Sequence, residues 1–139
     1  MCGFAGFIDK NSYSLGSSEI LRAMGESIFH RGPDDEGIWL MKSKGLGLVH
    51  RRLSVIDLSQ GGHQPMHSHT GRYVIAYNGE IYNYRTLRSD LEKLGKCFST
   101  ESDTEILLAS IETWGLEKGL ERLAGMFAFA LVDLKEETL

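Results

Sequence analysis

The chain has 139 residues, of which 42% are hydrophobic and 24% charged, and its formal net charge is -4. This length allows one domain or a piece of one, and this composition excludes an intrinsically disordered chain. The absence of a basic block disfavours a nucleic-acid binder, and the absence of an apolar stretch of roughly 18 residues disfavours a membrane protein. Two cysteines are too few for a disulfide framework and no secretory signal pattern opens the chain, so we expect a cytoplasmic protein.

The first half of the chain predicts strands on both sides of one helix. Short apolar runs at 2–8, 37–41 and 46–56 are typical of buried strands. Ser18 is a candidate N-cap of the helix, whose apolar side chains share one face: Ile20, Leu21, Met24 and Ile28. The segment 30–37, which reads HRGPDDEG, combines glycine, proline and acidic residues and therefore predicts an ordered turn.

The middle of the chain predicts a loop, a strand and a helix. Residues 59–71 lack periodicity and are rich in glycine and histidine, which indicates a solvated loop. The apolar run at 73–77 predicts a strand that leads directly into Asn78. A helix is expected after Asn83, a candidate cap, and Gly95 is expected to end it.

The last part of the chain predicts two helices and a final strand. Ser102 and Glu105 match a capping box at the start of the first helix. A short helix at 116–123 and a strand at 126–132 follow. Because strands and helices are segregated along the chain rather than strictly alternating, we expect an α+β fold with antiparallel sheets.

Cys2 is the first candidate catalytic residue. Removal of Met1 would leave an α-amino group on Cys2 itself, and this amine can take the thiol proton without a histidine or aspartate partner. The alternative is that Cys2 is a buried thiol that packs as a small hydrophobic residue. We assign no role to Cys97, which we expect to be partly buried near the end of a helix.

Two further pairs of residues suggest a site for an amino acid. The Asn78 amide and the Gly79 backbone N–H can together hold a developing oxyanion, although a simple turn explains the same pair. Arg52 and Asp103 are the residue types that bind the carboxylate and the ammonium group of an amino acid. The alternatives are a charged surface rim for Arg52 and an interaction with the helix dipole for Asp103.

Metal and phosphate sites are not expected. The spacing of His50, His63, His67 and His69 resembles that of metal ligands, but no acid or thiol clusters with them in the sequence. The glycines form no phosphate-binding motif, so we expect no ATP site within these residues.

Six segments of the sequence resemble the class II glutamine amidotransferase domain, in the order of that family and over the whole chain. They are MCGFAG at 1–6, HRGPDDEG at 30–37, RRLSVIDLS at 51–59, NGEIYN at 78–83, SDTE at 102–105 and GMFAFA at 125–130. Pro33, Asp34 and the NGEIYN run are most similar to the glutaminase domain of glutamine-hydrolysing asparagine synthetases. Synthetase-like amidotransferases that amidate other carboxylates, for instance in surface-polysaccharide pathways, share this type of domain.

The resemblance implies an N-terminal-nucleophile hydrolase, a four-layer αββα sandwich that is truncated at its C-terminus in residues 1–139. It also implies that further strands follow, and then a synthetase domain that uses ATP and Mg²⁺ and accepts ammonia. Within the domain itself the resemblance implies no cofactor. Glutamine is the implied ligand, and a homodimer is one assembly that we leave open.

The resemblance also implies roles for individual residues. Cys2 would attack the side-chain amide of glutamine with its own α-amino group as the base, and Asn78 and Gly79 would form the oxyanion hole. The implied binding residues are Arg52 for the α-carboxylate, Asp103 and Glu80 for the α-ammonium group, and Leu53, Ser54, Val55 and Ile56 for the pocket lining, with Arg31 at its mouth. Two alternatives are a noncatalytic glutamine-binding module and a fragment too short to assemble the pocket.

Overall fold

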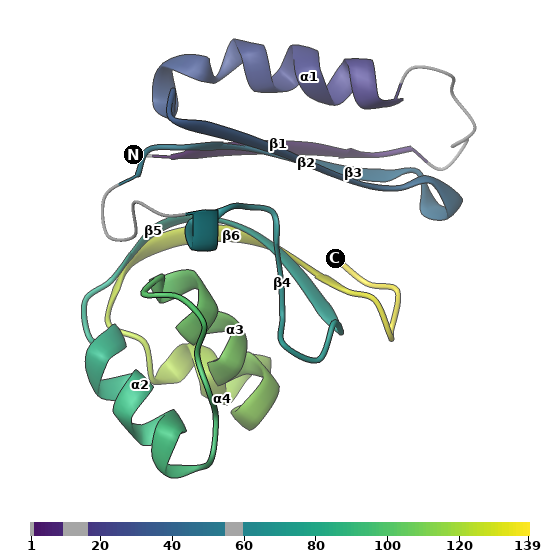
Figure 1. Cartoon of the computed structure of the whole chain (residues 1–139). Coiled ribbons are helices and arrows are strands. Elements are labelled where there is room, and N and C mark those ends of the chain that lie inside the picture. Colours follow the sequence, from purple (N-terminus) through teal and green to yellow (C-terminus); the bar gives the residue numbers. More distant parts are fainter. Residues whose placement is uncertain (1, 10–16, 55–59) are drawn as a thin grey trace.

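Two antiparallel sheets lie face to face between two layers of helices in the computed structural model of the chain (Figure 1). The structure describes residues 2–9, 17–54 and 60–139. The first sheet has the strand order β1-β3-β2 and consists of β1 (Gly3–Ile8), β2 (Asp35–Met41) and β3 (Leu46–Arg52). The second sheet has the order β4-β5-β6 and consists of β4 (Met66–His67), β5 (Tyr73–Ile81) and β6 (Gly125–Asp133).

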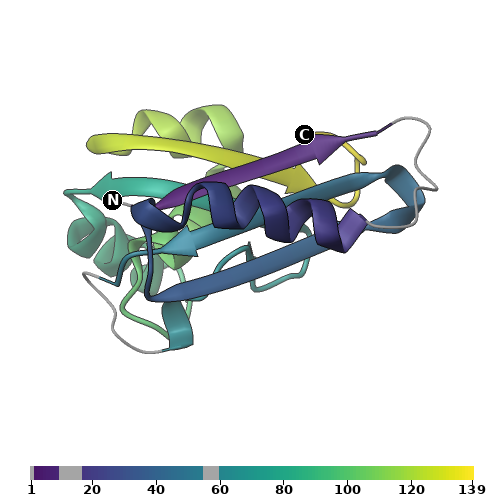
Figure 2. The ribbon, with the colours of Figure 1, turned by 90° about the horizontal axis from the view of Figure 1, so that it is seen from above.

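Helices cover the outer face of each sheet. The first sheet carries α1 (Ser17–Ser27), and the second carries α2 (Tyr84–Lys93), α3 (Asp103–Trp114) and α4 (Leu116–Glu121) (Figure 1). Seen from above, α1 lies along the first sheet (Figure 2). The α+β class and the αββα order of layers are therefore confirmed.

The central strands are buried on both faces, which explains their apolar sequences. Every residue of β3 is buried, because α1 covers one face of the first sheet and the second sheet covers the other. In β5 the side chains alternate: Ile75 and Tyr77 belong to the core under the helices, whereas Val74 and Ala76 belong to the core between the sheets. This alternation places Asn78 on the face of β5 that is directed toward the first sheet.

Three boundaries differ from those predicted. The strand β2 begins at Asp35 instead of Gly37, and β3 ends at Arg52 instead of continuing to Ile56, which lies outside the described residues. The strand β5 continues through Asn78 to Ile81, so the interpretation of Asn78 as part of a turn is wrong. The extension follows from the pairing of β5 with β6, which continues to the pair formed by Ile81 and Gly125.

The prediction of a solvated loop at 59–71 is also wrong in part. This segment contains a 3₁₀ turn at Gln60–Gly62 and the short strand β4, which pairs Met66 with Ile75. Gln64 and Ser68 are buried, and their side chains accept hydrogen bonds from backbone N–H groups of β5. The correct part of the prediction is the exposure of His63, His67 and His69.

Of the two predicted helix caps, the structure confirms Ser102 on α3 but not Asn83 on α2. Asn83 makes no capping bond to α2, and its side chain instead accepts from the Ala124 N–H at 2.9 Å. Ser102 caps α3 by accepting the Thr104 N–H at 3.2 Å. Glu105 does not return a bond to Ser102 but accepts two backbone N–H groups of the preceding segment, so the capping box is only half formed. Cys97 is exposed rather than partly buried.

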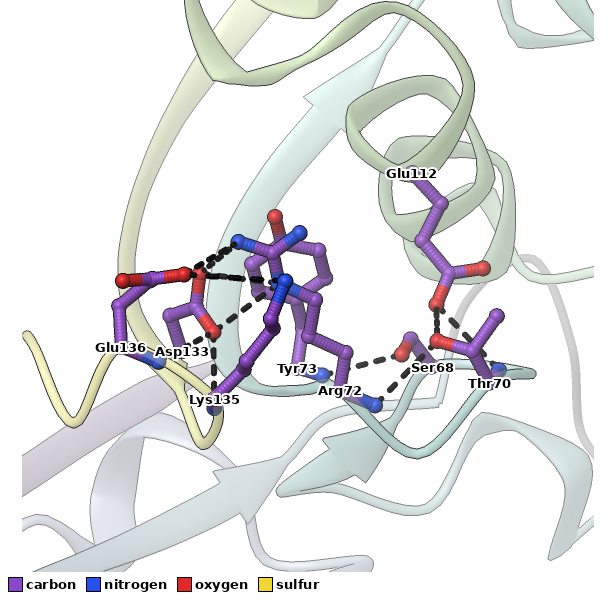
Figure 3. A network of polar contacts seen from close by, with 8 residues as sticks. All are labelled: Ser68, Thr70, Arg72, Tyr73, Glu112, Asp133, Lys135 and Glu136. Carbon is purple, nitrogen blue, oxygen red and sulfur yellow. Dashed lines mark hydrogen bonds and ion pairs between the residues drawn. The ribbon is translucent and has the colours of Figure 1, made fainter.

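A polar network closes the end of the second sheet where β5 begins and β6 ends (Figure 3). The Arg72 guanidinium binds both carboxylate oxygens of Asp133, with Nη2 at 2.6 Å from Oδ2, and holds the pKa of Asp133 at about 2. On the β4 side of the same network, the Ser68 hydroxyl accepts the Tyr73 N–H at 3.1 Å. Within the described residues, no helix is long and apolar enough to cross a membrane.

Candidate active site

One cavity of about 300 Å³ brings together most of the residues that the sequence singles out. Its lining residues come mainly from the N-terminus, the end of β3 and the end of β5. These three parts of the chain lie at the same end of the sandwich in Figure 1. Its lining consists of Cys2, Arg52, Leu53, Gly62, Gln64, Tyr77, Asn78, Gly79, Glu80, Tyr82, Ser102, Asp103, Thr104 and Met126. The cavity therefore combines a thiol, an amide beside a glycine, a guanidinium and two carboxylates.

The Cys2 sulfur is held at the cavity by the backbone that follows β3. The Leu53 N–H donates to Cys2 Sγ at 3.3 Å, and the carbonyl oxygen of the same residue lies 3.6 Å from Sγ. The Arg31 Nε donates to the carbonyl oxygen of Cys2 at 3.4 Å. Cys2 is half-buried and faces the cavity rather than the apolar core, which argues against a purely structural thiol.

Asn78 and Gly79 stand on the same cavity as Cys2, on the last part of β5. Gly79 pairs with Phe127 of β6, and a Cβ atom added to Gly79 would lie 2.5 Å from the Phe127 Cα. The close approach of β6 therefore requires glycine at this position, independently of any ligand. The absence of a side chain also leaves the Gly79 backbone accessible from the cavity.

Arg52 and the neighbouring Arg51 are buried, so the interpretation of Arg52 as part of a charged surface rim is wrong. The Arg51 guanidinium faces away from the cavity, where it forms ion pairs with Glu26 at 2.8 Å and Glu36 at 2.5 Å. The Arg52 side chain lines the cavity and packs against Gly62, where a Cβ atom would collide with the guanidinium. Alternation along β3 thus directs Arg51 to an ion-pair cluster and Arg52 to the cavity.

Asp103 lies at the first position of α3 and is tied to β5. Its Oδ2 accepts from the Tyr77 hydroxyl at 3.1 Å and from the Ile81 N–H at 3.0 Å. Burial raises the pKa of Asp103 above its ordinary value, while these hydrogen bonds act in the opposite direction. Burial, together with the nearby Asp103 carboxylate, raises the pKa of Tyr77, so the phenol stays a neutral donor.

Only some of the other predicted lining residues are found at the cavity. Leu53 and Glu80 line the cavity, and Glu80 is exposed at its rim. The Ser54 N–H donates to Asp34 Oδ2 at 2.8 Å, and Ser54 is not among the lining residues. Val55 and Ile56 lie outside the described residues.

Sequence reasoning missed the roles of two buried polar residues that bind the backbone of Tyr77: Gln64, which lines the cavity, and His50, which lies behind Tyr77 on β3. Gln64 Oε1 accepts the Tyr77 N–H at 2.6 Å, and its Nε2 donates to Thr104 Oγ1 at 3.3 Å. His50 Nε2 donates to the Tyr77 carbonyl oxygen at 2.9 Å, and burial lowers the pKa of His50 to about 4. Two signals are available in the sequence: a histidine directly after the apolar run LGLV, and a glutamine directly before Pro65.

The described part of the chain brings no three His, Cys, Asp or Glu residues into an arrangement that could hold a metal ion. His63 Nδ1 instead lies 2.7 Å from Asp35 Oδ2. The groups that converge on the cavity are those expected to act on an amide of an amino acid.

Comparison with known proteins identifies the family of the chain. The whole chain, residues 1–139, matches the family model described as a glutamine amidotransferase domain. Over 141 residues it is 41% identical to the glutamine-hydrolyzing asparagine synthetase 1 of Bacillus subtilis (strain 168). This alignment covers 100% of this chain and 22% of the relative. Over 137 residues it is 36% identical to the glutamine-hydrolyzing asparagine synthetase B of Escherichia coli (strain K12). That alignment covers 99% of this chain and 24% of the relative. The chain thus spans about a fifth to a quarter of the length of these curated relatives.

A solved structure shares the fold. The glutamine phosphoribosylpyrophosphate amidotransferase of B. subtilis superposes with a TM-score of 0.72 over 95% of this chain and 34% of that chain, at 23% sequence identity. This likeness confirms the predicted N-terminal-nucleophile fold. With the match of the family model to all 139 residues, it follows that the chain belongs to the glutamine amidotransferase domain family.

Proposed function

We propose that the protein hydrolyses the side-chain amide of glutamine to glutamate and ammonia, with Cys2 as the nucleophile. The observation that carries the proposal is the convergence on one cavity of Cys2, Asn78, Gly79, Arg52 and Asp103. These groups supply a nucleophile, oxyanion donors and a charged pair that matches the two ends of an α-amino acid. The family membership of the whole chain supports the same reaction.

In the proposed binding mode, Arg52 binds the α-carboxylate of glutamine, and Asp103 and Glu80 bind its α-ammonium group. Asp103 is suited to this role because two donors on β5 already orient its carboxylate. Burial of Arg52 strengthens its attraction to a carboxylate, since little water competes at the site. The side-chain amide of glutamine would then reach toward Cys2.

The proposed reaction proceeds through a thioester. After removal of Met1, the α-amino group of Cys2 takes the thiol proton, and Sγ attacks the amide carbon. The negative charge on the amide oxygen is held by the Asn78 side-chain amide and the Gly79 backbone N–H. The C–N bond breaks as the α-ammonium group of Cys2 returns a proton to the departing ammonia. Water then attacks the γ-glutamyl thioester, the C–S bond breaks, and glutamate leaves as the thiol is restored.

We further propose that the ammonia serves an ATP-dependent synthetase domain. The curated relatives are glutamine-hydrolyzing asparagine synthetases, and this chain aligns with about a fifth to a quarter of their length. ATP and Mg²⁺ would be used in that domain. The hydrolysis itself needs only groups of this chain and water.

The test is a glutaminase assay combined with intact mass and labelling by 6-diazo-5-oxo-norleucine, an electrophile that mimics glutamine. Wild type should lack Met1, release ammonia from glutamine and carry one adduct on Cys2. Cys2→Ala should lose at least about a thousandfold in kcat yet still be stabilised by glutamine in thermal unfolding. Cys97→Ala is the matched control, because Cys97 is the other thiol and is exposed away from the cavity. Hydrolysis that persists in Cys2→Ala, or labelling at Cys97, would refute the proposal.

A further inference from the structure

The edge of β5 next to the site is completed by side chains instead of a neighbouring strand. The strand β4 pairs only two residues with β5, Met66 with Ile75 and His67 with Val74. In the same register Gln64 would stand opposite Tyr77, but the pairing of the two backbones ends at Met66 and Ile75. Beyond this point no backbone within the described ranges pairs with this edge of β5.

Two side chains take the place of the missing strand at Tyr77. Gln64 Oε1 accepts the Tyr77 N–H at 2.6 Å, and His50 Nε2 donates to the Tyr77 carbonyl oxygen at 2.9 Å. Because a carbonyl oxygen only accepts, this bond places the ring proton of His50 on Nε2. Gln64 also donates to Thr104 of α3, whereas His50 belongs to β3 of the first sheet. Tyr77 is thereby connected to β3, to α3 and to the segment that precedes β4.

Tyr77 directly precedes the residue whose amide is proposed to hold the oxyanion. The carbonyl of Tyr77 and the N–H of Asn78 lie in one rigid peptide plane, so fixing the Tyr77 carbonyl also fixes the backbone of Asn78. At the other end, Asp103 Oδ2 accepts the Ile81 N–H at 3.0 Å. The segment that contains Asn78 and Gly79 is therefore held at both ends.

Such anchoring affects catalysis because an oxyanion hole works only when its donors point at the developing charge. Displacement of catalytic groups by about 1 Å can cost on the order of a hundredfold in rate. Gln64 and His50 are 5% and 0% exposed, so their hydrogen bonds to Tyr77 are shielded from water.

We propose that Gln64 and His50 are positioning residues that fix the Tyr77 peptide and thereby aim Asn78 and Gly79 at the reacting amide. This inference rests on the proposed glutaminase activity. It predicts that the two side chains affect the rate of the chemical step more than the affinity for glutamine.

The test compares variants that remove each hydrogen bond with variants that retain it. Gln64→Met and His50→Leu remove the contacts to Tyr77, whereas Gln64→Glu retains an acceptor and His50→Gln retains a donor near the position of Nε2. For each protein, kcat and KM for glutamine hydrolysis are measured and kcat is normalised to the sites labelled by 6-diazo-5-oxo-norleucine. The removing variants should lose at least about tenfold in normalised kcat with KM within about threefold of wild type. The retaining variants should recover to within about threefold.

Ser68→Ala is the matched control. Ser68 Oγ accepts the Tyr73 N–H at 3.1 Å, which is the same kind of contact to the same edge of β5 at the end remote from the cavity (Figure 3). This variant should lower the temperature of thermal unfolding and leave normalised kcat unchanged. If Gln64 and His50 have a merely structural role, all of their variants should behave like Ser68→Ala. Their temperature of thermal unfolding should fall and their normalised kcat should stay unchanged.

Unchanged normalised kcat in both Gln64→Met and His50→Leu would overturn the inference. The proposed function would still stand, provided that wild type hydrolyses glutamine. A rise in KM alone would also overturn it, because it would make Gln64 a binding contact. If His50→Leu fails to fold, Gln64→Met decides, since Gln64 borders the cavity and its loss leaves the core between the sheets intact. A wild type that neither hydrolyses glutamine nor reacts at Cys2 would refute the proposed function itself, and the inference with it.

Discussion

The buried His50 should make the stability of the protein depend on pH in a defined window. Its side chain is 0% exposed, and burial is the main reason why its pKa falls from 6.5 to about 4 in the folded state. The hydrogen bond to the Tyr77 carbonyl and the charge of Asp35 oppose this effect, whereas two nearby basic groups add to it: Arg52 and His63. In the unfolded chain, His50 binds its proton with an ordinary pKa near 6.5.

The direction of the effect follows from which state binds the proton first. As the pH falls below 6.5, the unfolded chain takes up a proton that folded His50 does not accept, so the free energy of unfolding decreases. The loss continues until the pH reaches about 4, where the folded state is protonated too. A lowering of the pKa from 6.5 to about 4 corresponds to about 3 kcal/mol of stability that is present above pH 6.5 and lost by pH 4.

Urea unfolding of wild type and His50→Gln at a series of pH values between 7.5 and 4 measures this contribution. The glutamine side chain introduced at position 50 does not titrate, so the variant lacks only the pH-dependent contribution of His50 to the free energy of unfolding. Other titrating groups such as Asp103 affect both proteins alike. The stability advantage of wild type over the variant should shrink by about 3 kcal/mol as the pH falls from 7.5 to 4. A difference that stays constant across this range would refute the assignment of a buried, neutral His50.

Two substitutions test other features of the fold by urea unfolding at neutral pH. Gly79→Ala should lower the free energy of unfolding by about 1–3 kcal/mol, because the added Cβ would lie 2.5 Å from the Phe127 Cα and force β6 away from β5. A change below about 0.5 kcal/mol would mean that the strands adjust freely at this point. Ser102→Ala should cost about 1 kcal/mol, because the Thr104 N–H at the start of α3 loses its acceptor. Unaltered stability in that variant would show that water replaces the cap without loss.

The elements that could be predicted from the sequence are those whose signals are local. The helix α1 and the strand β6 lie close to their predicted ranges, because the periodicity of their own apolar residues decides them. The start of α3 is correct since Ser102 caps it directly. The sequence predicts a solvated loop for Gln64 and Ser68 and is wrong there, because their partners lie on β5 and no local pattern shows that β5 passes beside them.

The residues of the candidate site also divide into those that local sequence signals predict and those that depend on distant parts of the chain. The position of Cys2 and the Asn78–Gly79 pair carry a chemical signal in the sequence, and the structure brings them to one cavity. The different environments of Arg51 and Arg52 follow from alternation along β3, which is visible only once the strand and its two covering layers are known. His50 carries no such signal, because its role depends on a carbonyl group of the other sheet.

The cavity and its polar anchors have a common origin in the shortness of β4. A longer β4 would satisfy the Tyr77 backbone with its own main chain and would extend the second sheet across the place where the cavity opens. The pairing of β4 with β5 ends at Met66 and Ile75, and Gln64, the next residue that would face β5 in this register, bonds to Tyr77 through its side chain instead. The same interruption therefore creates room for a ligand beside Cys2 and requires buried side chains to hold β5 in place there.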